Sequence, residues 1–374
     1  MLAMLLALAQ LVPCNQLSAQ VQVSDLPLTI KCGPFKTLHV QGIAVDAYCS
    51  FTTMLAKYDF DGKLIGTVTG LLGHLGCLDF NETDGKVYGS LEYKDDAIGR
   101  GILNKEGSDK KFRDNFYVAV IDVDRITRVG MDGEKDGVVT VIPLPTVLDD
   151  YSAKVSVGGK NLDHRFACSG IDGLSFGPRI GKTSGKHFLT VAYGVYGDKS
   201  RSDNDYQVLL QYDLAKCRKF AKPLSQDNPQ FKGPSKPAGR YFVYTGSTDW
   251  GVQNLEYDAS SGLWYMAVYR GKKPEFPNYS LYAFSSGARC VKKTLTGIPY
   301  YKMGNVVPLA QGGLQDSNTG ISGWNFPYGS TGMHSFGNGY FYISENKSGK
   351  DGESTVLRLY RRTEGKEAFK AVER

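Results

Sequence analysis

Short runs of apolar, β-branched and aromatic residues recur along the chain, and most of them end at Gly, Asp or Asn. The clearest runs cover residues 54–70, 85–93, 116–124, 187–197, 206–214, 263–271 and 339–346. Alternating or continuous apolar runs that are closed by turn residues predict β-strands. Because no segment shows the periodicity of an amphipathic helix of three turns, the sequence predicts an all-β fold.

Five segments share a further pattern, in which a small or polar start leads into a short apolar strand, a turn and a second hydrophobic strand. They are HVQGIAVD (39–46), HLGCLDFN (74–81), CSGIDGLSFGP (168–178), VQNLEYD (252–258) and GMHSFGNG (332–339). This order is typical of β-propeller blades, whose four antiparallel strands begin with a short one at the central channel. We therefore predict innermost strands at residues 40–46, 75–80, 169–176, 252–257 and 333–336.

The number of blades stays open at five, six or seven. The intervals between most starts exceed the roughly 40–50 residues of a bare blade. Loop-like stretches favour five elaborated blades, and they lie at 94–114, 198–204, 226–238 and 308–330. The segment 21–30 is expected to supply an outer strand that closes the ring with the last blade. Residues 20–374 would then form one β-propeller domain.

The first 19 residues have the apolar core and small-residue end of a secretory signal, with cleavage expected after Ala19. The protein is thus predicted to be secreted or periplasmic, and no segment is long and apolar enough for a transmembrane helix. Cys14 raises the alternative of a lipid anchor, but Pro13 fits that motif poorly. Six cysteines remain, which allow 15 disulfide pairings. For them we expect buried thiols with at most one bridge.

Composition changes this picture little. The 44 Gly, 23 Tyr and 18 Phe suit many short strands joined by turns. The net charge of +6 is small for 374 residues, and no Lys/Arg-rich stripe is present, so nucleic acid is not an expected partner. The sequence also lacks a phosphate-binding loop, a dinucleotide fingerprint and a GxSxG nucleophile motif.

Four of the five histidines stand at or near the repeated starts, namely His39, His74, His164 and His334. Innermost strands begin at the channel mouth, so these side chains are expected to meet polar residues at comparable positions, which are Gln41, Asp172, Gln253 and Asn254. One interpretation is a divalent cation, calcium or a transition metal, bound by His334, Gln253 and Asp172. Another is metal-free acid–base chemistry. A third is that these groups only hydrogen-bond strand ends and channel water.

Aromatic and basic residues gather in the segments just before the repeated starts. Residues 240–254 contain Arg240, Tyr244 and Trp250, and Tyr193 begins another such segment. Aromatic rings suit the C–H faces of sugars, and a guanidinium group pairs with a uronate carboxylate. We therefore expect Arg240 and Trp250 to line a glycan-binding pocket.

Two motifs, GHLG at 73–76 and TGSTDWGVQNLEYD at 245–258, resemble the family of rhamnosyl-glucuronate lyases. The resemblance extends over most of residues 35–360. It implies a seven-bladed propeller with a histidine-centred site and a bound cation, which cleaves an acidic oligo- or polysaccharide by β-elimination. It assigns proton transfer to His74, His39, His164 and Tyr193, and substrate binding to Arg240, Arg165, Tyr244 and Trp250. His74 is the first candidate because glycines flank its motif and would let a ligand approach the backbone.

Two other function classes remain open. The same face could bind a glycan or protein partner without catalysis. A glycoside hydrolase would need two carboxylates facing one another, and only Asp172 and Asp79 are suitably placed among the repeated starts. We rank hydrolysis below the lyase for that reason.

Overall fold

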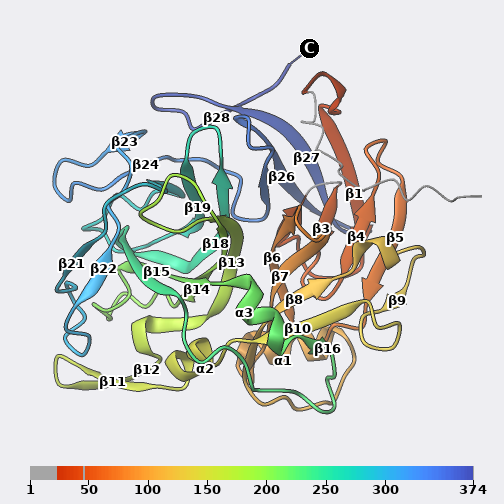
Figure 1. Cartoon of the computed structure of the whole chain (residues 1–374), viewed down its shortest axis with the longest axis horizontal. Helices are drawn as coiled ribbons and strands as arrows, with labels where there is room; N and C mark the ends of the chain where they lie inside the picture. Colours follow the sequence, from red (N-terminus) through yellow and green to blue (C-terminus); the bar gives the residue numbers. More distant parts are fainter. Residues whose placement is uncertain (1–22, 45–46, 374) are drawn as a thin grey trace, which may run out of the picture.

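The computed structural model describes residues 23–44 and 47–373. Five β-sheets surround a central channel in it, so the predicted β-propeller is confirmed and its blades number five (Figure 1). The seven blades implied by the family resemblance are therefore wrong for this chain. The predicted signal peptide at 1–19 lies outside the described residues. Within the described ranges, no helix has the length and apolar character needed to cross a membrane.

The innermost strands are the edge strands β2 (Gly42–Ala44), β6 (His74–Asn81), β13 (Cys168–Pro178), β18 (Thr248–Asp258) and β25 (Met333–Ser335). Each coincides with a predicted innermost strand. Each also packs against the next around the channel, and β25 packs back against β2. The ring is narrow enough for β6 and β18, which belong to blades that are not neighbours, to contact each other as well.

The outer strands follow the innermost ones in each blade. Blade 1 continues with β3 (Tyr48–Ser50), β4 (Leu55–Tyr58), β5 (Leu64–Thr69) and β9 (Met131–Asp132). Blade 2 continues with β7 (Lys86–Tyr93), β8 (Asn115–Ile121), β10 (Val139–Pro143) and β16 (Lys222–Pro223). Blade 3 continues with β14 (His187–Val195), β15 (Tyr206–Tyr212), β17 (Gly239–Tyr244), β22 (Gly304–Val306) and β21 (Val291–Lys293). Blade 4 continues with β19 (Leu263–Arg270) and β20 (Leu281–Ser285).

Blade 5 is completed by both ends of the described chain. After β26 (Tyr340–Gly349) and β27 (Gly352–Arg362), its outer strand is β1 (Thr29–Phe35), which pairs antiparallel with β27, and β28 (Phe369–Ala371) also pairs with β27 (Figure 1). The predicted ring closure is thus confirmed, but the strand begins at Thr29 and not at residue 21. Residues 23–25 form a 3₁₀ turn instead, and Pro27 has no N–H to donate to a ladder.

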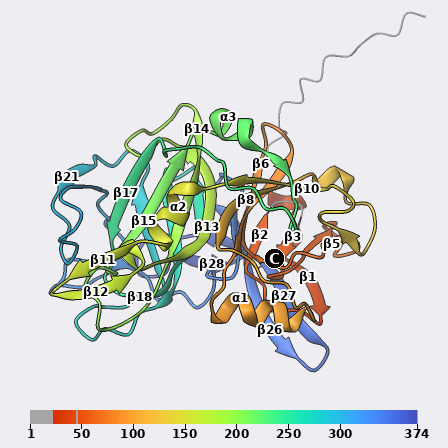
Figure 2. The same ribbon diagram turned by 90° about the horizontal axis from the view of Figure 1, so that it is seen from below.

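The remaining elements decorate the blades. Two short hairpins pair β11 (Lys154–Val157) with β12 (Lys160–Asp163) and β23 (Leu314–Gln315) with β24 (Ser322–Gly323). The helices are α1 (Ala97–Lys105), α2 (Pro145–Tyr151) and α3 (Leu214–Cys217). Of these, α1 lies within the stretch 94–114 that was predicted to be a loop, and it is seen in the lower part of Figure 2, beside β26 and β27.

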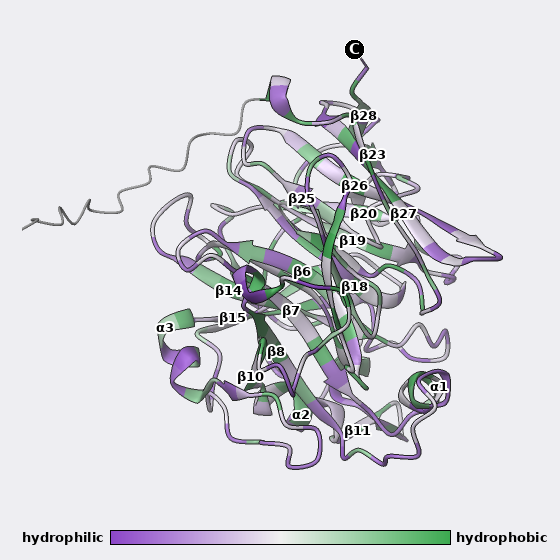
Figure 3. Cartoon of the chain, turned by 90° about the vertical axis from the view of Figure 1, so that its right-hand side faces the viewer, coloured by the Kyte–Doolittle hydropathy of each residue, from purple (hydrophilic) through white to green (hydrophobic). Residues whose placement is uncertain are grey.

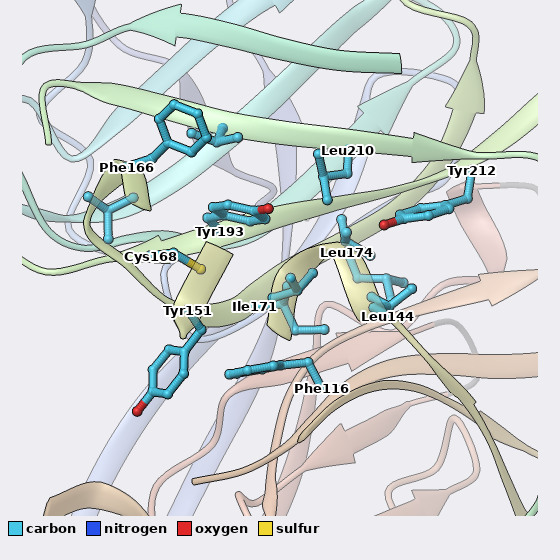
Figure 4. Packing of buried hydrophobic residues seen from close by; sticks show 14 of the residues in the cluster. Phe116, Leu144, Tyr151, Phe166, Cys168, Ile171, Leu174, Tyr193, Leu210 and Tyr212 are labelled. Atoms are coloured by element: carbon cyan, nitrogen blue, oxygen red, sulfur yellow. The ribbon is translucent and has the colours of Figure 1, made fainter. Parts of the chain in front are cut away.

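The hydrophobic core lies between blades. Hydrophobic colouring follows the strands while hydrophilic residues concentrate in the connecting segments (Figure 3). Between blades 2 and 3, side chains such as Phe116, Ile171, Leu174 and Tyr193 pack together (Figure 4). All six cysteines of the described chain are free thiols, five of them buried, in agreement with the expectation of buried thiols.

Candidate functional site

A cavity of about 720 Å³ opens at the end of the channel where the innermost strands begin. Its polar lining comes from blades 1 to 4, and α1 supplies part of an apolar wall. The polar and aromatic lining residues are His39, Gln41, Thr52, His74, Glu92, Lys94, Ser169, Asp172, Asp249, Trp250, Gln253 and Tyr269. The predicted convergence is therefore observed for His39, His74, Asp172, Gln253 and Trp250.

His74, the first residue of β6, lines the cavity. Its Nδ1 lies 3.7 Å from Glu92 Oε1 and 3.5 Å from Asp172 Oδ1, and it has no hydrogen-bond partner. Glu92 reaches this point because it pairs with His74 in the antiparallel register of β6 and β7. One ligand-type atom from each of the three residues lies within 4.8 Å of the others. We call His74, Glu92 and Asp172 the mouth group.

Lys94 neutralises the mouth group. Its Nζ lies 2.5 Å from Glu92 Oε1 and 3.7 Å from Asp96 Oδ2, and it donates to the carbonyl of Ser169 at 2.8 Å. The Lys94 side chain is only 4% exposed, so this charge is held away from bulk water. It is the only lysine or arginine among the described residues that line the cavity.

Glycine makes the approach of Glu92 to blade 3 possible. Gly170 has φ 125°, and a Cβ built on it would lie 2.0 Å from Glu92 Oε2. That same oxygen accepts a hydrogen bond from the backbone N–H of Ile171 at 3.0 Å. The glycines of the GHLG motif also face protein atoms: a Cβ on Gly73 would meet Glu92 O, and one on Gly76 would meet the hydroxyl of Ser90. The expectation that these glycines admit a ligand is thus replaced by a packing role.

A bulge places Trp250 at the cavity. The register of β18 and β19 shifts between Asp249 and Val252, and Trp250 and Gly251 both take positive φ values of 67° and 71°. A Cβ on Gly251 would lie 2.5 Å from the carbonyl of Tyr193, so glycine is required there. The Trp250 carbonyl accepts a hydrogen bond from Gln253 Nε2 at 2.9 Å, which fixes the turn. The cost of the strained backbone is consistent with a functional position.

The protonation states differ across the cavity. Burial, followed by the nearby His74, lowers the pKa of His39, whose Nε2 is hydrogen-bonded to Gln41 Nε2. Burial, followed by the charge of Glu92, raises the pKa of Asp172 to about 6. Burial acts to raise the pKa of Glu92, but Lys94 and His74 outweigh it and hold that pKa below its ordinary value. Burial also raises the pKa of Tyr269 to about 12, so its hydroxyl stays protonated at neutral pH.

Three predicted site residues lie together elsewhere, around the buried Asp150 of α2. Arg165 and Arg240 donate to its two carboxylate oxygens at 2.6 and 2.8 Å, and the hydroxyl of Tyr193 donates to it at 2.6 Å. Tyr193 is fully buried in the core between blades 2 and 3 (Figure 4). None of the three lines the mouth cavity.

Two more predicted residues pack against aromatic rings outside the cavity lining. His164 lies between Tyr151 and Tyr196, with ring centroids 4.5 and 5.1 Å away, and its Nδ1 is hydrogen-bonded to the Tyr151 carbonyl. Tyr244 packs against Tyr206, with ring centroids 5.0 Å apart, and less closely against Phe276.

The predicted metal ligands are divided between two places. Asp172 and Gln253 are hydrogen-bonded to each other at the mouth, at 3.1 Å. His334 instead belongs to a second buried cluster with Asp79 and Glu256, where one ligand-type atom of each residue lies within 4.8 Å of the others. We call these three residues the deep group, because Asp79 and Glu256 lie further along β6 and β18 than the residues of those strands that line the mouth. The side chains of Asp79 and Asp172, predicted as a candidate hydrolase pair, therefore belong to different groups.

Sequence reasoning missed Glu92, Lys94 and Tyr269. All three lie at or just after the ends of second strands. In an antiparallel blade the end of the second strand lies beside the start of the first, as the pairs His74–Glu92 and Asp249–Tyr269 show. Pairing each predicted strand start with the end of the strand that follows would have found Glu92 and Lys94.

No family model and no curated protein matches this chain. Among solved structures, the β-propeller domain of Cps50 (Swd1) from Myceliophteria thermophila is similar, with 8% identity, 88% of this chain and 99% of that chain covered, and a TM-score of 0.32. The Dos1 propeller has 9% identity, 83% and 75% coverage and a TM-score of 0.26. The fold assignment rests on the five sheets described above, and nothing in these comparisons supports membership of a polysaccharide lyase family.

Proposed function

We propose that the mouth cavity binds a uronate-containing glycan, of the rhamnosyl-glucuronate type, and that the protein cleaves it by β-elimination. The observation that carries this proposal is the presence of His39, His74, Lys94, Trp250 and Tyr269 in one cavity of about 720 Å³. Base, acid, cation and aromatic ring are the groups that this reaction requires. Export from the cytoplasm is part of the proposal and rests on the apolar N-terminal segment.

Each step has a candidate residue. His39, with its lowered pKa, is neutral at pH 7, and its Nε2 takes the proton from C5 of the uronate once the substrate displaces the hydrogen bond from Gln41 Nε2. The electrons of that C–H bond form the C4–C5 double bond, and the bond from C4 to the glycosidic oxygen breaks. The hydroxyl of Tyr269 donates a proton to the leaving oxygen. The product is an unsaturated uronate and a new chain end.

The proposed carboxylate partner changes from Arg240 and Arg165 to Lys94. Both arginines pair with Asp150 outside the cavity lining, whereas Lys94 lines the cavity, where it also pairs with Glu92. A preorganised cation beside the uronate stabilises the negative charge that develops when the C5 proton leaves, an effect commonly worth about 3–4 kcal/mol. The ring of Trp250 and the apolar side chains of α1 offer surfaces for the sugar C–H groups.

A specific observation favours a second candidate, glycoside hydrolysis. The environments of Glu92 and Asp172 push their pKa values apart, below the ordinary value for Glu92 and up to about 6 for Asp172. Such a split is typical of a paired nucleophile and acid, and retaining hydrolases place two carboxylates about 5 Å apart. In this reaction Asp172 would protonate the leaving oxygen.

The test incubates the purified chain with a panel of acidic glycans that includes a rhamnosyl-glucuronate polymer. We expect the ultraviolet absorbance of an unsaturated uronate to appear. His39→Gln and Tyr269→Phe should each lower turnover by about a hundredfold. His187→Gln is the matched control, because His187 is an exposed histidine at the opposite end of blade 3 from the cavity.

Other outcomes decide between the function classes. New reducing ends without the unsaturated product would replace the lyase by a hydrolase. Binding without any cleavage would leave a non-catalytic glycan-binding propeller. Equal turnover in wild type, His39→Gln and Tyr269→Phe would show that cleavage does not use the proposed residues.

A further inference from the structure

The deep group joins three innermost strands that are far apart in the sequence. Asp79 lies on β6 of blade 2, Glu256 on β18 of blade 4 and His334 on β25 of blade 5. One ligand-type atom of each residue lies within 4.8 Å of the others, and His334 Nδ1 lies 3.7 Å from Glu256 Oε1. None of the three lines the mouth cavity.

Two atoms of the deep group are buried without a hydrogen-bond partner. They are Glu256 Oε2 and His334 Nδ1, on side chains that are only 4% and 10% exposed. Other carboxylate oxygens of the deep group already accept hydrogen bonds. Glu256 Oε1 accepts from the N–H of Ser335 at 2.6 Å, and Asp79 accepts from the N–H of Phe176 at 2.6 Å. Unsatisfied buried polar atoms are costly and call for a missing partner.

Within the part of the chain that the structure describes, no basic side chain from outside the deep group pairs with its carboxylates. Over residues 23–44 and 47–373, no lysine or arginine forms an ion pair with Asp79 or Glu256. Burial accordingly raises the pKa of Asp79 to about 6, raises the pKa of Glu256 and lowers the pKa of His334 to about 4. A bound cation would favour the ionised form of Asp79 and Glu256, against the effect of burial, and the neutral imidazole of His334, which burial already favours, because carboxylates and imidazoles bind metals in their deprotonated forms.

We propose that the deep group binds one divalent transition-metal ion of the zinc class, through one oxygen each of Asp79 and Glu256 and through His334 Nδ1. Two carboxylates and an imidazole are ligands that zinc takes at about 2.0–2.2 Å, with water at the fourth position. Calcium would require six to eight oxygen ligands, so the imidazole favours a transition metal. The ion would tie the innermost strands of blades 2, 4 and 5 together. Of the ligands predicted from the sequence, only His334 is retained.

The test uses the purified full chain, stripped with a chelator and then given Zn²⁺ alone. We expect about one Zn²⁺ per chain to remain after gel filtration, and Zn²⁺ to raise the melting temperature by at least about 2 °C. Glu256→Gln and His334→Gln should each weaken Zn²⁺ binding at least about tenfold. Glu82→Gln is the matched control: it removes a nearby exposed charge without removing a ligand, and its affinity should stay within about twofold.

Co²⁺ provides a measurement that does not depend on the variants folding. Co²⁺ added to the stripped wild-type chain should give visible d–d absorption, and Zn²⁺ should abolish it by displacement. The proposal is overturned if the wild-type chain retains no Zn²⁺, or if folded Glu256→Gln and His334→Gln bind it as tightly as wild type. Because glycan cleavage is assayed separately with residues of the mouth, failure of this inference and failure of the proposed function can be distinguished.

Discussion

The channel contains two buried groups of similar side chains in different electrostatic surroundings. The mouth group has His74, Glu92 and Asp172, and the deep group has His334, Glu256 and Asp79. At the mouth, the ammonium of Lys94 lies 2.5 Å from Glu92 and keeps that carboxylate ionised. No such cation pairs with Glu256 within the described chain, and burial raises the pKa of Glu256. In the functions proposed above, the mouth group lies in the same cavity as the proton-transfer residues His39 and Tyr269, and the deep group binds the metal ion.

The largest effect is expected from removing the built-in cation of the mouth. Lys94→Met leaves the ionised and buried Glu92 without its partner, which should cost about 3–5 kcal/mol of unfolding free energy. The double variant Glu92→Gln/Lys94→Met removes both charges and should recover most of this loss. Urea denaturation of the three proteins measures the difference. A loss below about 1 kcal/mol for Lys94→Met would mean that Lys94 does not compensate Glu92.

Glu92 of the mouth group and Asp79 of the deep group should contribute with opposite signs to the pH dependence of the unfolding free energy. The pKa of Glu92 is lowered on folding, so its contribution is present above its unfolded pKa near 4.3 and is lost as the pH falls. The pKa of Asp79 is raised from 3.8 to about 6, so its contribution is present below the unfolded pKa and is lost as the pH rises through about 6. This second change amounts to at most about 3 kcal/mol.

Urea unfolding of the chelator-treated protein between pH 3.5 and 7.5 checks these signs. Asp79→Asn should reduce the decline in stability between about pH 4 and pH 6, to which the raised pKa of Asp172 also contributes, and Glu92→Gln should flatten the loss below about pH 4. If Asp79→Asn leaves the upper decline unchanged, burial of the deep group does not destabilise the ionised carboxylate. The chelator is needed because a bound ion would hold Asp79 ionised in the folded state.

The fold could be predicted from the sequence because its pattern is local. Each innermost strand begins with a small or polar residue and is followed by a turn and a second hydrophobic strand, so all five were found. Convergence of His39, His74 and Gln253 followed from the same rule, since innermost strands all begin at the mouth. Glu92 and Lys94 were not found, because they depend on how the second strand pairs with the first.

The residues whose positions were wrongly predicted are placed by contacts between distant parts of the chain, and no local sequence pattern contains such contacts. Asn254 donates hydrogen bonds to the carbonyls of both Gln41 and Ser330, and His334 lies beside Glu256 and not in the mouth lining. Arg240 was expected to meet a substrate carboxylate, but α2 supplies the buried carboxylate of Asp150 in its place. That contact joins residues 90 positions apart, and the sequence alone gives no sign of it.

The smallest effect on the unfolding free energy is expected from Glu256→Gln in the deep group, compared with the same change, Glu92→Gln, in the mouth group. Glu256→Gln replaces a carboxyl group that burial already keeps protonated, and the amide oxygen can still accept from the N–H of Ser335. In chelator at pH 5, we therefore expect the unfolding free energy to change by less than about 1 kcal/mol. Glu92→Gln is the same change at the mouth, but it strands the buried ammonium of Lys94 and should cost about 3 kcal/mol or more. Equal losses of unfolding free energy for the two variants, measured by urea unfolding, would mean that Lys94 does not cause the electrostatic difference between the mouth group and the deep group.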